Sequence, residues 1–208
     1  LIEDDFRFFK FDETREKSGT TLSCYFNAVI PAFERLKQEG KIDHWGIGLG
    51  QGEALIKAIN YSKPPEAMQC AVNVLNSIGA IGYVNEKNDP NKILNECQNK
   101  NIPILAIRAV QAGALTSSMD RKPHESGFDV EDFKDFEKAL PFREYAKKVN
   151  ENPASLAHRY ALSQEKVSSV ILGVKNRKEL LECIKAESAG ELDKEMLANL
   201  NNLFKNMK

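Results

Sequence analysis

Two basic side chains, Lys175 and Arg177, follow an apolar segment directly and stand at the start of a helical pattern. Arginine offers phosphate oxygens a planar fork of donors, and lysine offers them a compact positive charge. Cations are unfavourable at the N-terminus of a helix unless an anion is also there. The pattern therefore predicts a phosphate-binding position, and a solvated basic helix start is the alternative interpretation.

Gln69 and Arg108 stand within or just after two other apolar segments. Arg108 leads into a loop of small residues that contains Val110 and Gly113, and such a loop lets the backbone approach a ligand closely. An amide and a guanidinium at these places could contact a polar ligand. The alternatives are a solvent-facing glutamine at a strand end and an arginine held in a structural ion pair.

Other chemistries find no support in the spacing of residues. The three histidines have no metal-ligand spacing, and neither a G-x-S-x-G elbow nor a P-loop is present. The glycines of 46–52 do not complete a dinucleotide fingerprint, because the third glycine would fall at Gln51. The four cysteines form no C-x-x-C pair, which is typical of reduced structural thiols.

Composition excludes several classes of protein. The 208 residues carry 29 basic and 30 acidic side chains, so a net charge of -1 disfavours binding to nucleic acid. No window approaches the roughly 20 apolar residues that cross a bilayer, and no secretory signal is recognisable. We expect a cytoplasmic protein that forms a single domain over residues 1–208.

The chain alternates apolar segments with amphipathic ones. Continuous apolar strands separated by helices predict a parallel sheet covered by helices, and about four such units make half of a (β/α)8 barrel. The polar stretch 117–135 is predicted to be a functional loop, in which Asp129 to Asp135 form a solvated loop or helix start. The predicted strands are 42–49, 67–73, 103–109 and 168–174, and the predicted helices are 28–40, 53–61, 91–101, 142–149, 153–163 and 177–188, with a last helix opening at 190–193.

Several blocks of the chain resemble the aldo-keto reductase family. Residues 32–42 are similar to the family's block before its fifth strand, and Gln69 stands where the sixth strand carries a glutamine. Residues 108–116 resemble the end of the seventh strand and its loop, and 153–163 resemble a conserved helix pattern. Residues 170–182 resemble the eighth strand and the helix start after it. The resemblance implies an α/β protein of the TIM-barrel family, with this chain covering strands five to eight and a C-terminal helix.

The resemblance also implies an NADP(H)-dependent oxidoreductase that reduces aldehydes or ketones by hydride transfer. It places Gln69 at the nicotinamide amide, Lys175 and Arg177 at the 2′-phosphate, and Glu182 near the adenine. The implied cofactor-binding residues are Gln69, Arg108, Val110, Gly113, Gly173, Lys175, Arg177 and Glu182.

Some positions depart from the family pattern. Ile107 stands where an aromatic residue usually stacks on the nicotinamide, and Cys183 replaces a usual asparagine. Gly48 and Leu49 align with a Ser-Asn pair, for which Gln51 could substitute. These exchanges favour, as an alternative function, an NADP(H)-binding sensor or regulatory protein without catalysis.

The family's catalytic Tyr, Lys, Asp and His cannot be placed on this chain. One register puts Leu1 just past the fourth strand, and another puts Glu3 at the histidine position. We therefore expect the chain alone to be inactive, with the missing half of the barrel supplying the proton donor. An inactive truncated fragment is a further alternative. Open edges of a half-barrel also predict self-association.

Overall fold

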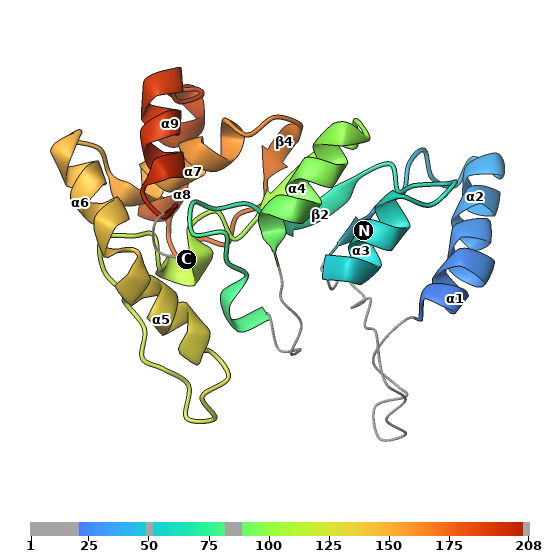
Figure 1. Cartoon of the computed structure of the whole chain (residues 1–208), viewed down its shortest axis with the longest axis horizontal. Helices are drawn as coiled ribbons and strands as arrows, with labels where there is room; N and C mark the ends of the chain where they lie inside the picture. Colours follow the sequence, from blue (N-terminus) through green and yellow to red (C-terminus); the bar gives the residue numbers. More distant parts are fainter. Residues whose placement is uncertain (1–20, 49–51, 82–88, 206–208) are drawn as a thin grey trace. The chain divides into compact units, whose positions relative to one another are not determined.

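A computed structural model describes residues 21–48, 52–81 and 89–205 of the chain (Figure 1). The chain divides into two compact units, one formed by residues 1–70 and 84–105 and the other by 71–83 and 106–208. Each unit contains both strands and helices. The structure is therefore α/β, as the alternation of apolar and amphipathic segments predicts.

The four strands are hydrogen-bonded in chain order, β1-β2-β3-β4. In the first unit, β1 pairs in parallel with β2, with Ile47 opposite Met68, and the Met68 amide donates to the Pro103 carbonyl at 3.0 Å. In the second unit, the Ile171 amide donates to the Ala106 carbonyl at 2.8 Å. The strands are β1 (Ile47–Gly48), β2 (Met68–Ala71), β3 (Ile104–Ile107) and β4 (Val167–Val170).

The first unit contains a π-helical turn immediately before a proline. Pro31 has no amide hydrogen, so it cannot close an α-helical turn back to Asn27, and the five residues before α2 widen into π-helix. The Trp45 indole donates to Glu34 at 2.7 Å and joins this helix to the segment before β1. The helices of this unit are α1 (Leu22–Cys24), η2 (Tyr25–Val29), α2 (Ile30–Gln38), α3 (Gly52–Ile59) and α4 (Pro90–Asn99).

The second unit has a continuous apolar core. Phe142, Leu156 and Leu200, from three different helices, are fully buried in it together with Leu115 from the loop after β3. Burying side chains of this size stabilises a fold by about 1.5–3 kcal/mol each. The helices are η3 (Gly79–Ile81), η4 (Gln111–Gly113), α5 (Val130–Lys138), α6 (Leu140–Lys148), α7 (Pro153–Leu162), α8 (Arg177–Ser188) and α9 (Lys194–Asn202).

The sequence prediction was wrong about the solvation of part of 117–135. Helix α5 begins at Val130, in agreement with the helix start that was one of the two interpretations, but Asp129, Asp132 and Asp135 are buried instead of solvated. The strands are also shorter than predicted, and β4 is half-exposed. The predicted helix 177–188 is confirmed by α8. Leu49 and Gln51 lie outside the described residues.

Helix α8 carries its apolar side chains on an exposed face. Leu180, Leu181 and Ile184 are 43%, 46% and 51% exposed, whereas Ala186 on the other side of the helix is buried. Ile171 and Leu172, which follow β4, are exposed as well. A helix normally buries its apolar stripe, so this stripe lacks a covering element among the described residues.

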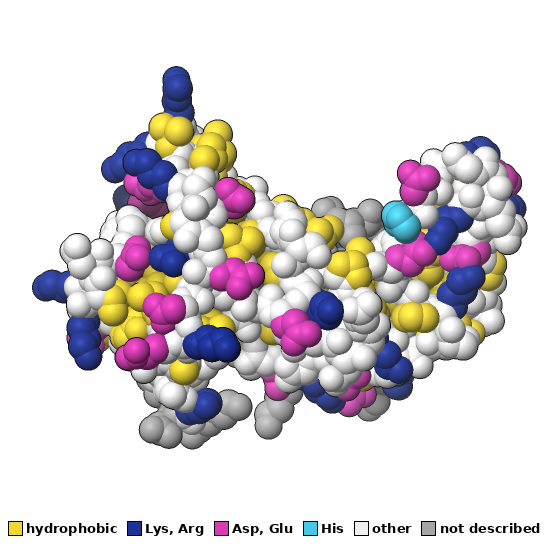
Figure 2. Space-filling view, turned by 90° about the horizontal axis from the view of Figure 1, so that it is seen from above, with side chains coloured by type: hydrophobic (Ala, Val, Ile, Leu, Met, Phe, Trp, Pro, Cys, Tyr) yellow, Lys and Arg dark blue, Asp and Glu magenta, His cyan; other side chains and the backbone are white. Residues whose placement is uncertain are grey.

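The surface carries charges of both signs. Figure 2 shows basic and acidic side chains interspersed over the face in view, as the near-zero net charge predicts. Among the described residues, the helices are all too short or too polar to cross a bilayer.

Candidate cofactor site

The loop that follows β3 has an unusual backbone. Arg108, Gln111 and Ala112 have φ angles of 58°, 47° and 50°, and Gly113 follows at 98°. Left-handed backbone costs a residue with a Cβ on the order of 1–2 kcal/mol and is therefore uncommon outside glycine. Such conformations persist only when surrounding contacts enforce them, and they gather at ligand-binding sites.

The loop satisfies much of its own backbone. The Val110 carbonyl accepts from the amides of Gly113 at 3.0 Å and Leu115 at 3.1 Å. The Gly113 carbonyl accepts from the Thr116 amide and hydroxyl, at 3.1 and 2.8 Å. These amides are thus used inside the loop, which fixes its shape.

A buried amide and hydroxyl network lies beneath the loop. The fully buried Gln111 donates from Nε2 to Asp135 Oδ2 at 2.8 Å and accepts at Oε1 from Asn73 Nδ2 at 3.2 Å. Asn73 also donates to the Arg108 carbonyl, and the Ser77 hydroxyl donates to Asp135 at 2.5 Å. The network joins the loop after β2 to the loop after β3, because its polar groups must find partners away from water.

Arg108 is held by an ion pair. Its Nη2 donates to Asp132 Oδ1 at 2.5 Å and to the Ile78 carbonyl at 2.8 Å, while its Nε is buried without a partner. The arginine side chain is 16% exposed and the aspartate 4%. The structure therefore shows the ion pair that stood as the alternative to phosphate binding.

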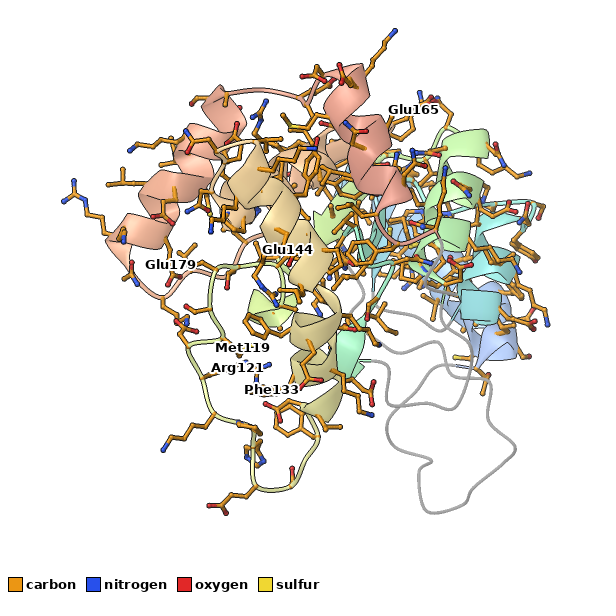
Figure 3. The ribbon with its side chains drawn as sticks, turned by 60° about the vertical axis from the view of Figure 1, so that its left-hand side comes forward. Met119, Arg121, Phe133, Glu144, Glu165 and Glu179 are labelled. Atoms are coloured by element: carbon orange, nitrogen blue, oxygen red, sulfur yellow. The ribbon has the colours of Figure 1, made fainter. Side chains whose placement is uncertain are left out.

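Arg121 pairs with two of the buried acids. Its guanidinium bonds Asp129 and donates to Asp132 Oδ2 at 2.9 Å, and its charge lies 4.8 Å from the centre of the Phe133 ring (Figure 3). Asp129 also accepts from the His124 amide at 2.9 Å. This hydrogen bond, followed by the Arg121 contact, holds the pKa of Asp129 below its usual value.

Gly79 lets these groups approach one another. A methyl group there would collide with Asp132 Oδ1 and would lie 2.5 Å from Arg108 Nη2 and 2.6 Å from Gln111 Nε2. Its φ angle of 51° also favours glycine. No other residue fits this position without displacing the network.

The start of α8 presents the predicted phosphate ligands. Lys175 and Arg177 are exposed, and the Lys175 ammonium group pairs with Asp120, whose pKa it lowers. The Asn176 side chain caps the helix by accepting from the Glu179 amide at 3.0 Å. Glu179 in turn accepts from the Lys175 amide at 2.8 Å, so an acidic side chain already occupies this backbone donor.

The remaining predicted residues are not brought into these networks. Gly173 is exposed with open space around its Cα, and Glu182 is half-buried on α8. Gln69 lies in the first unit, where it is 6% exposed in β2. A methyl group at Gly48 would lie 3.0 Å from Gln69 Cβ, so the glycine at 48 leaves room for this glutamine.

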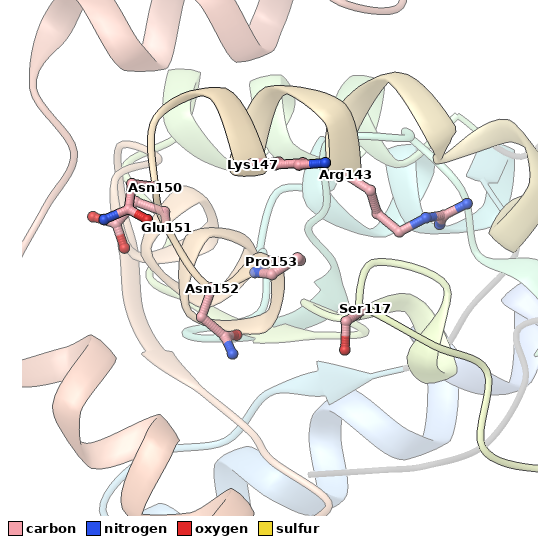
Figure 4. A pocket seen from close by; sticks show the side chains of 7 residues that line it. All are labelled: Ser117, Arg143, Lys147, Asn150, Glu151, Asn152 and Pro153. Atoms are coloured by element: carbon pink, nitrogen blue, oxygen red, sulfur yellow. The ribbon is translucent and has the colours of Figure 1, made fainter.

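A pocket of about 480 Å³ lies beside α6 (Figure 4). Arg143 in its wall donates to the carbonyls of Ala114 at 3.1 Å and Phe136 at 2.7 Å, so this guanidinium supports the loop after β3. The lining residues are Ser117, Arg143, Lys147, Asn150, Glu151, Asn152 and Pro153.

Other reactive groups have structural surroundings. Burial raises the pKa of Tyr160 to about 12, and its hydroxyl donates to Asn201 at 2.8 Å. Burial lowers the pKa of His158, whose Nε2 lies 3.4 Å from Cys183 Sγ. The described part of the chain holds no group of three His, Cys, Asp or Glu side chains placed to bind a metal.

Sequence reasoning did not find the acids of α5. Asp129, Asp132 and Asp135 recur every three residues, which places them along one side of the helix, but alone this spacing is also typical of a solvated face. The sequence does not show that Arg108 and Arg121 both contact the acidic side of α5.

Comparison with known proteins assigns the family. Residues 9–205 match the Aldo/keto reductase family, and the chain therefore belongs to it. The fold is that of an α/β oxidoreductase family whose members form (β/α)8 barrels and generally bind a nicotinamide cofactor. No curated protein is similar enough to the chain to count as a match.

Solved structures share the fold. Aldo-keto reductase AKR11C1 from Bacillus halodurans is 19% identical with a TM-score of 0.65, and the match covers 88% of this chain and 56% of that one. The thermostable aldo-keto reductase Tm1743 is 18% identical with a TM-score of 0.57, and the match covers 83% of this chain and 53% of that one. The aldo-keto reductase MGS-M4, from a Medee basin deep-sea metagenome, is 18% identical with a TM-score of 0.55, and the match covers 86% of this chain and 56% of that one. The chain thus spans about half the length of these relatives.

Proposed function

We propose that the chain is the cofactor-binding half, strands five to eight of the barrel, of an NADP(H)-dependent aldo-keto reductase. The observation that carries this proposal is the pair of exposed basic side chains, Lys175 and Arg177, placed directly after β4 and at the start of α8 in a chain of this family. A helix N-terminus favours an anion, and the two cations would add the charge that binds the additional phosphate of NADP(H).

The residues of the site fit such a cofactor in chemical type. Lys175 and Arg177 would hold the 2′-phosphate, with the exposed Gly173 leaving the backbone accessible beside them. Gln69 would pair with the nicotinamide amide. Glu182 would lie near the adenine. When bound, NADPH supplies the hydride that reduces an aldehyde or ketone.

The loop after β3 would border the pyrophosphate with Val110 and Gly113. Arg108 is bound to Asp132 through Nη2, so its contribution to the phosphates would come from the rest of its guanidinium group. Hydrogen bonds within the loop fix its left-handed backbone, and a loop fixed in this way loses less conformational entropy on binding.

The chain alone is proposed to bind cofactor without turnover. A general acid contributes about 10²–10⁴-fold to a rate, and Tyr160, one of the described tyrosines, is engaged with Asn201. A small carbonyl compound is the proposed substrate of the whole protein. A cytoplasmic location and the absence of nucleic-acid partners remain predictions.

A titration of the purified chain tests the proposal. We expect NADPH fluorescence to change saturably, and the Lys175→Met/Arg177→Met variant to weaken NADPH binding at least about ten-fold while NADH binding is unchanged. Lys178→Met/Lys185→Met, on the same helix, serves as the matched control and should bind both cofactors like the wild type.

Three outcomes would contradict it. A chain with the circular dichroism of a folded α/β protein but without NADPH binding would refute both the reductase and the sensor function. Reduction of aldehydes by the chain alone would refute the half-barrel assignment. A chain without a cooperative melting transition would identify it as the inactive fragment.

A further inference from the structure

Helix α5 and Asp129, the residue before it, bury three carboxylates on one side. Asp129, Asp132 and Asp135 are 2%, 3% and 2% exposed. Burying a carboxylate is unfavourable unless it is paired and hydrogen-bonded. Apart from Lys138, which contacts Asp135 from within α5, the partners of these three carboxylates come from outside the helix, so the acidic side of α5 connects the helix to the neighbouring loops.

Asp132 uses both of its oxygens. Oδ1 accepts from the Ala80 amide at 2.9 Å and from Arg108 Nη2 at 2.5 Å, and Oδ2 accepts from Arg121 Nη2 at 2.9 Å. Ala80 belongs to the loop after β2, Arg108 to the loop after β3, and Arg121 to the segment before α5. One carboxylate thus joins three segments of the chain.

Asp135 distributes its hydrogen bonds differently. Oδ2 accepts from Ser77 Oγ at 2.5 Å and from the buried Gln111 Nε2 at 2.8 Å. Oδ1 lies 3.4 Å from the exposed ammonium group of Lys138. The two aspartates are both buried, but of the two only Asp132 accepts hydrogen bonds shorter than 3 Å from described residues on each oxygen.

We propose that Asp132 is the positioning residue of the loop after β3. By holding Arg108 in its left-handed conformation against the loop after β2, it fixes the backbone that borders the cofactor, although it contacts no cofactor itself. The consequence for affinity rests on the proposed function, whereas the consequence for the loops does not.

An asparagine distinguishes the two acids. The Asn side chain has one acceptor oxygen and one donor nitrogen. At position 132, either orientation turns the nitrogen toward a donor, Arg121 in one case and Arg108 with Ala80 in the other. At position 135, the oxygen can face Ser77 and Gln111 while the nitrogen faces solvent near Lys138. Asp132→Asn should therefore disturb the loops, and Asp135→Asn should not.

Hydrogen–deuterium exchange measures the loops directly. We expect Asp132→Asn to accelerate exchange about ten-fold or more in peptides covering 72–81 and 108–116, with exchange in α7 unchanged. Asp135→Asn and the surface control Glu131→Gln should exchange like the wild type. If both loops of the Asp132→Asn variant exchange at the rate of the wild type, the proposal is overturned.

NADPH affinity and melting temperature separate positioning from stability. We expect Asp132→Asn to weaken NADPH binding about ten-fold. In Arg108→Met/Asp132→Leu, which removes the buried pair and leaves Arg121 paired with Asp129, the melting temperature should return toward that of the wild type while affinity stays low. Recovery of affinity together with stability would show a merely structural role.

Two further outcomes remain decisive. If Asp132→Asn does not fold, Arg108→Lys replaces it, because lysine keeps the charge but is shorter than the arginine, whose Nη2 donates to both Asp132 and Ile78; wild-type loop exchange in that variant would overturn the proposal. A wild-type chain that does not bind NADPH would refute the proposed function, while the exchange experiment would still decide the role of Asp132.

Discussion

The Lys175 ammonium group is ion-paired with Asp120, which lies in the loop between β3 and α5. The two side chains are 60% and 58% exposed, so water and salt screen this pair. The group proposed to bind the 2′-phosphate therefore already has an anionic partner, and a cofactor would compete with Asp120 for it.

Asp120→Asn should strengthen NADPH binding. Removing the competing carboxylate frees Lys175, and because an exposed pair is weak we expect about a two- to five-fold gain at low ionic strength. Fluorescence titration in 20 and 200 mM salt checks this result, with Glu125→Gln in the same loop as the control. Unchanged affinity in Asp120→Asn would show that Lys175 does not contact the phosphate.

Gly79→Ala should destabilise the second unit. The added methyl group would collide with Asp132 and crowd Arg108 Nη2, so we expect a loss on the order of 3 kcal/mol in the free energy of unfolding. Gly190→Ala is the matched control, because Gly190 has a similar φ of 74° but open space around it. Urea denaturation should show that Gly190→Ala loses about 1 kcal/mol in the free energy of unfolding, the cost of a left-handed residue with a Cβ. Equal losses in Gly79→Ala and Gly190→Ala would contradict the crowding of the network.

His158 should make stability depend on pH. Burial lowers its pKa in the folded protein, so the unfolded chain binds a proton more readily. The stability is complete above the unfolded pKa of about 6.5 and is lost as pH falls through the lower pKa of the folded state. His158→Gln should flatten the decline of the melting temperature between pH 7 and 5; a decline of the same size in both proteins would exclude His158 as its source.

The exposed stripe of α8 should make the chain self-associate. Leu180 and Ile184 lie four residues apart on this stripe, and exposed apolar patches favour association. We expect Leu180→Lys/Ile184→Lys to lower the mass measured by sedimentation equilibrium, while Phe128→Lys, at a residue 61% exposed, leaves it unchanged. A monomeric wild-type chain would refute this prediction.

Local patterns predicted the elements well. The helix predicted over 177–188 is α8 itself, because its apolar spacing, the capping Asn176 and the acidic first turn all lie within one segment. The strand predicted over 168–174 is shorter and half-exposed, because β-branched residues indicate a strand without indicating what covers it. Periodicity therefore located the elements but not their burial.

The candidate site divides in the same way. The amino-acid sequence by itself determined the family, the alternation of strands and helices, and the basic pair at 175 and 177, because these depend on residue types close together along the chain. Only the tertiary structure decided that Arg108 pairs with Asp132 and that the acids of α5 are buried. The contacts of Asp132 with Arg108 and Ala80 join residues 24 and 52 positions apart, and their energy exists only once the loops after β2 and β3 meet the same helix.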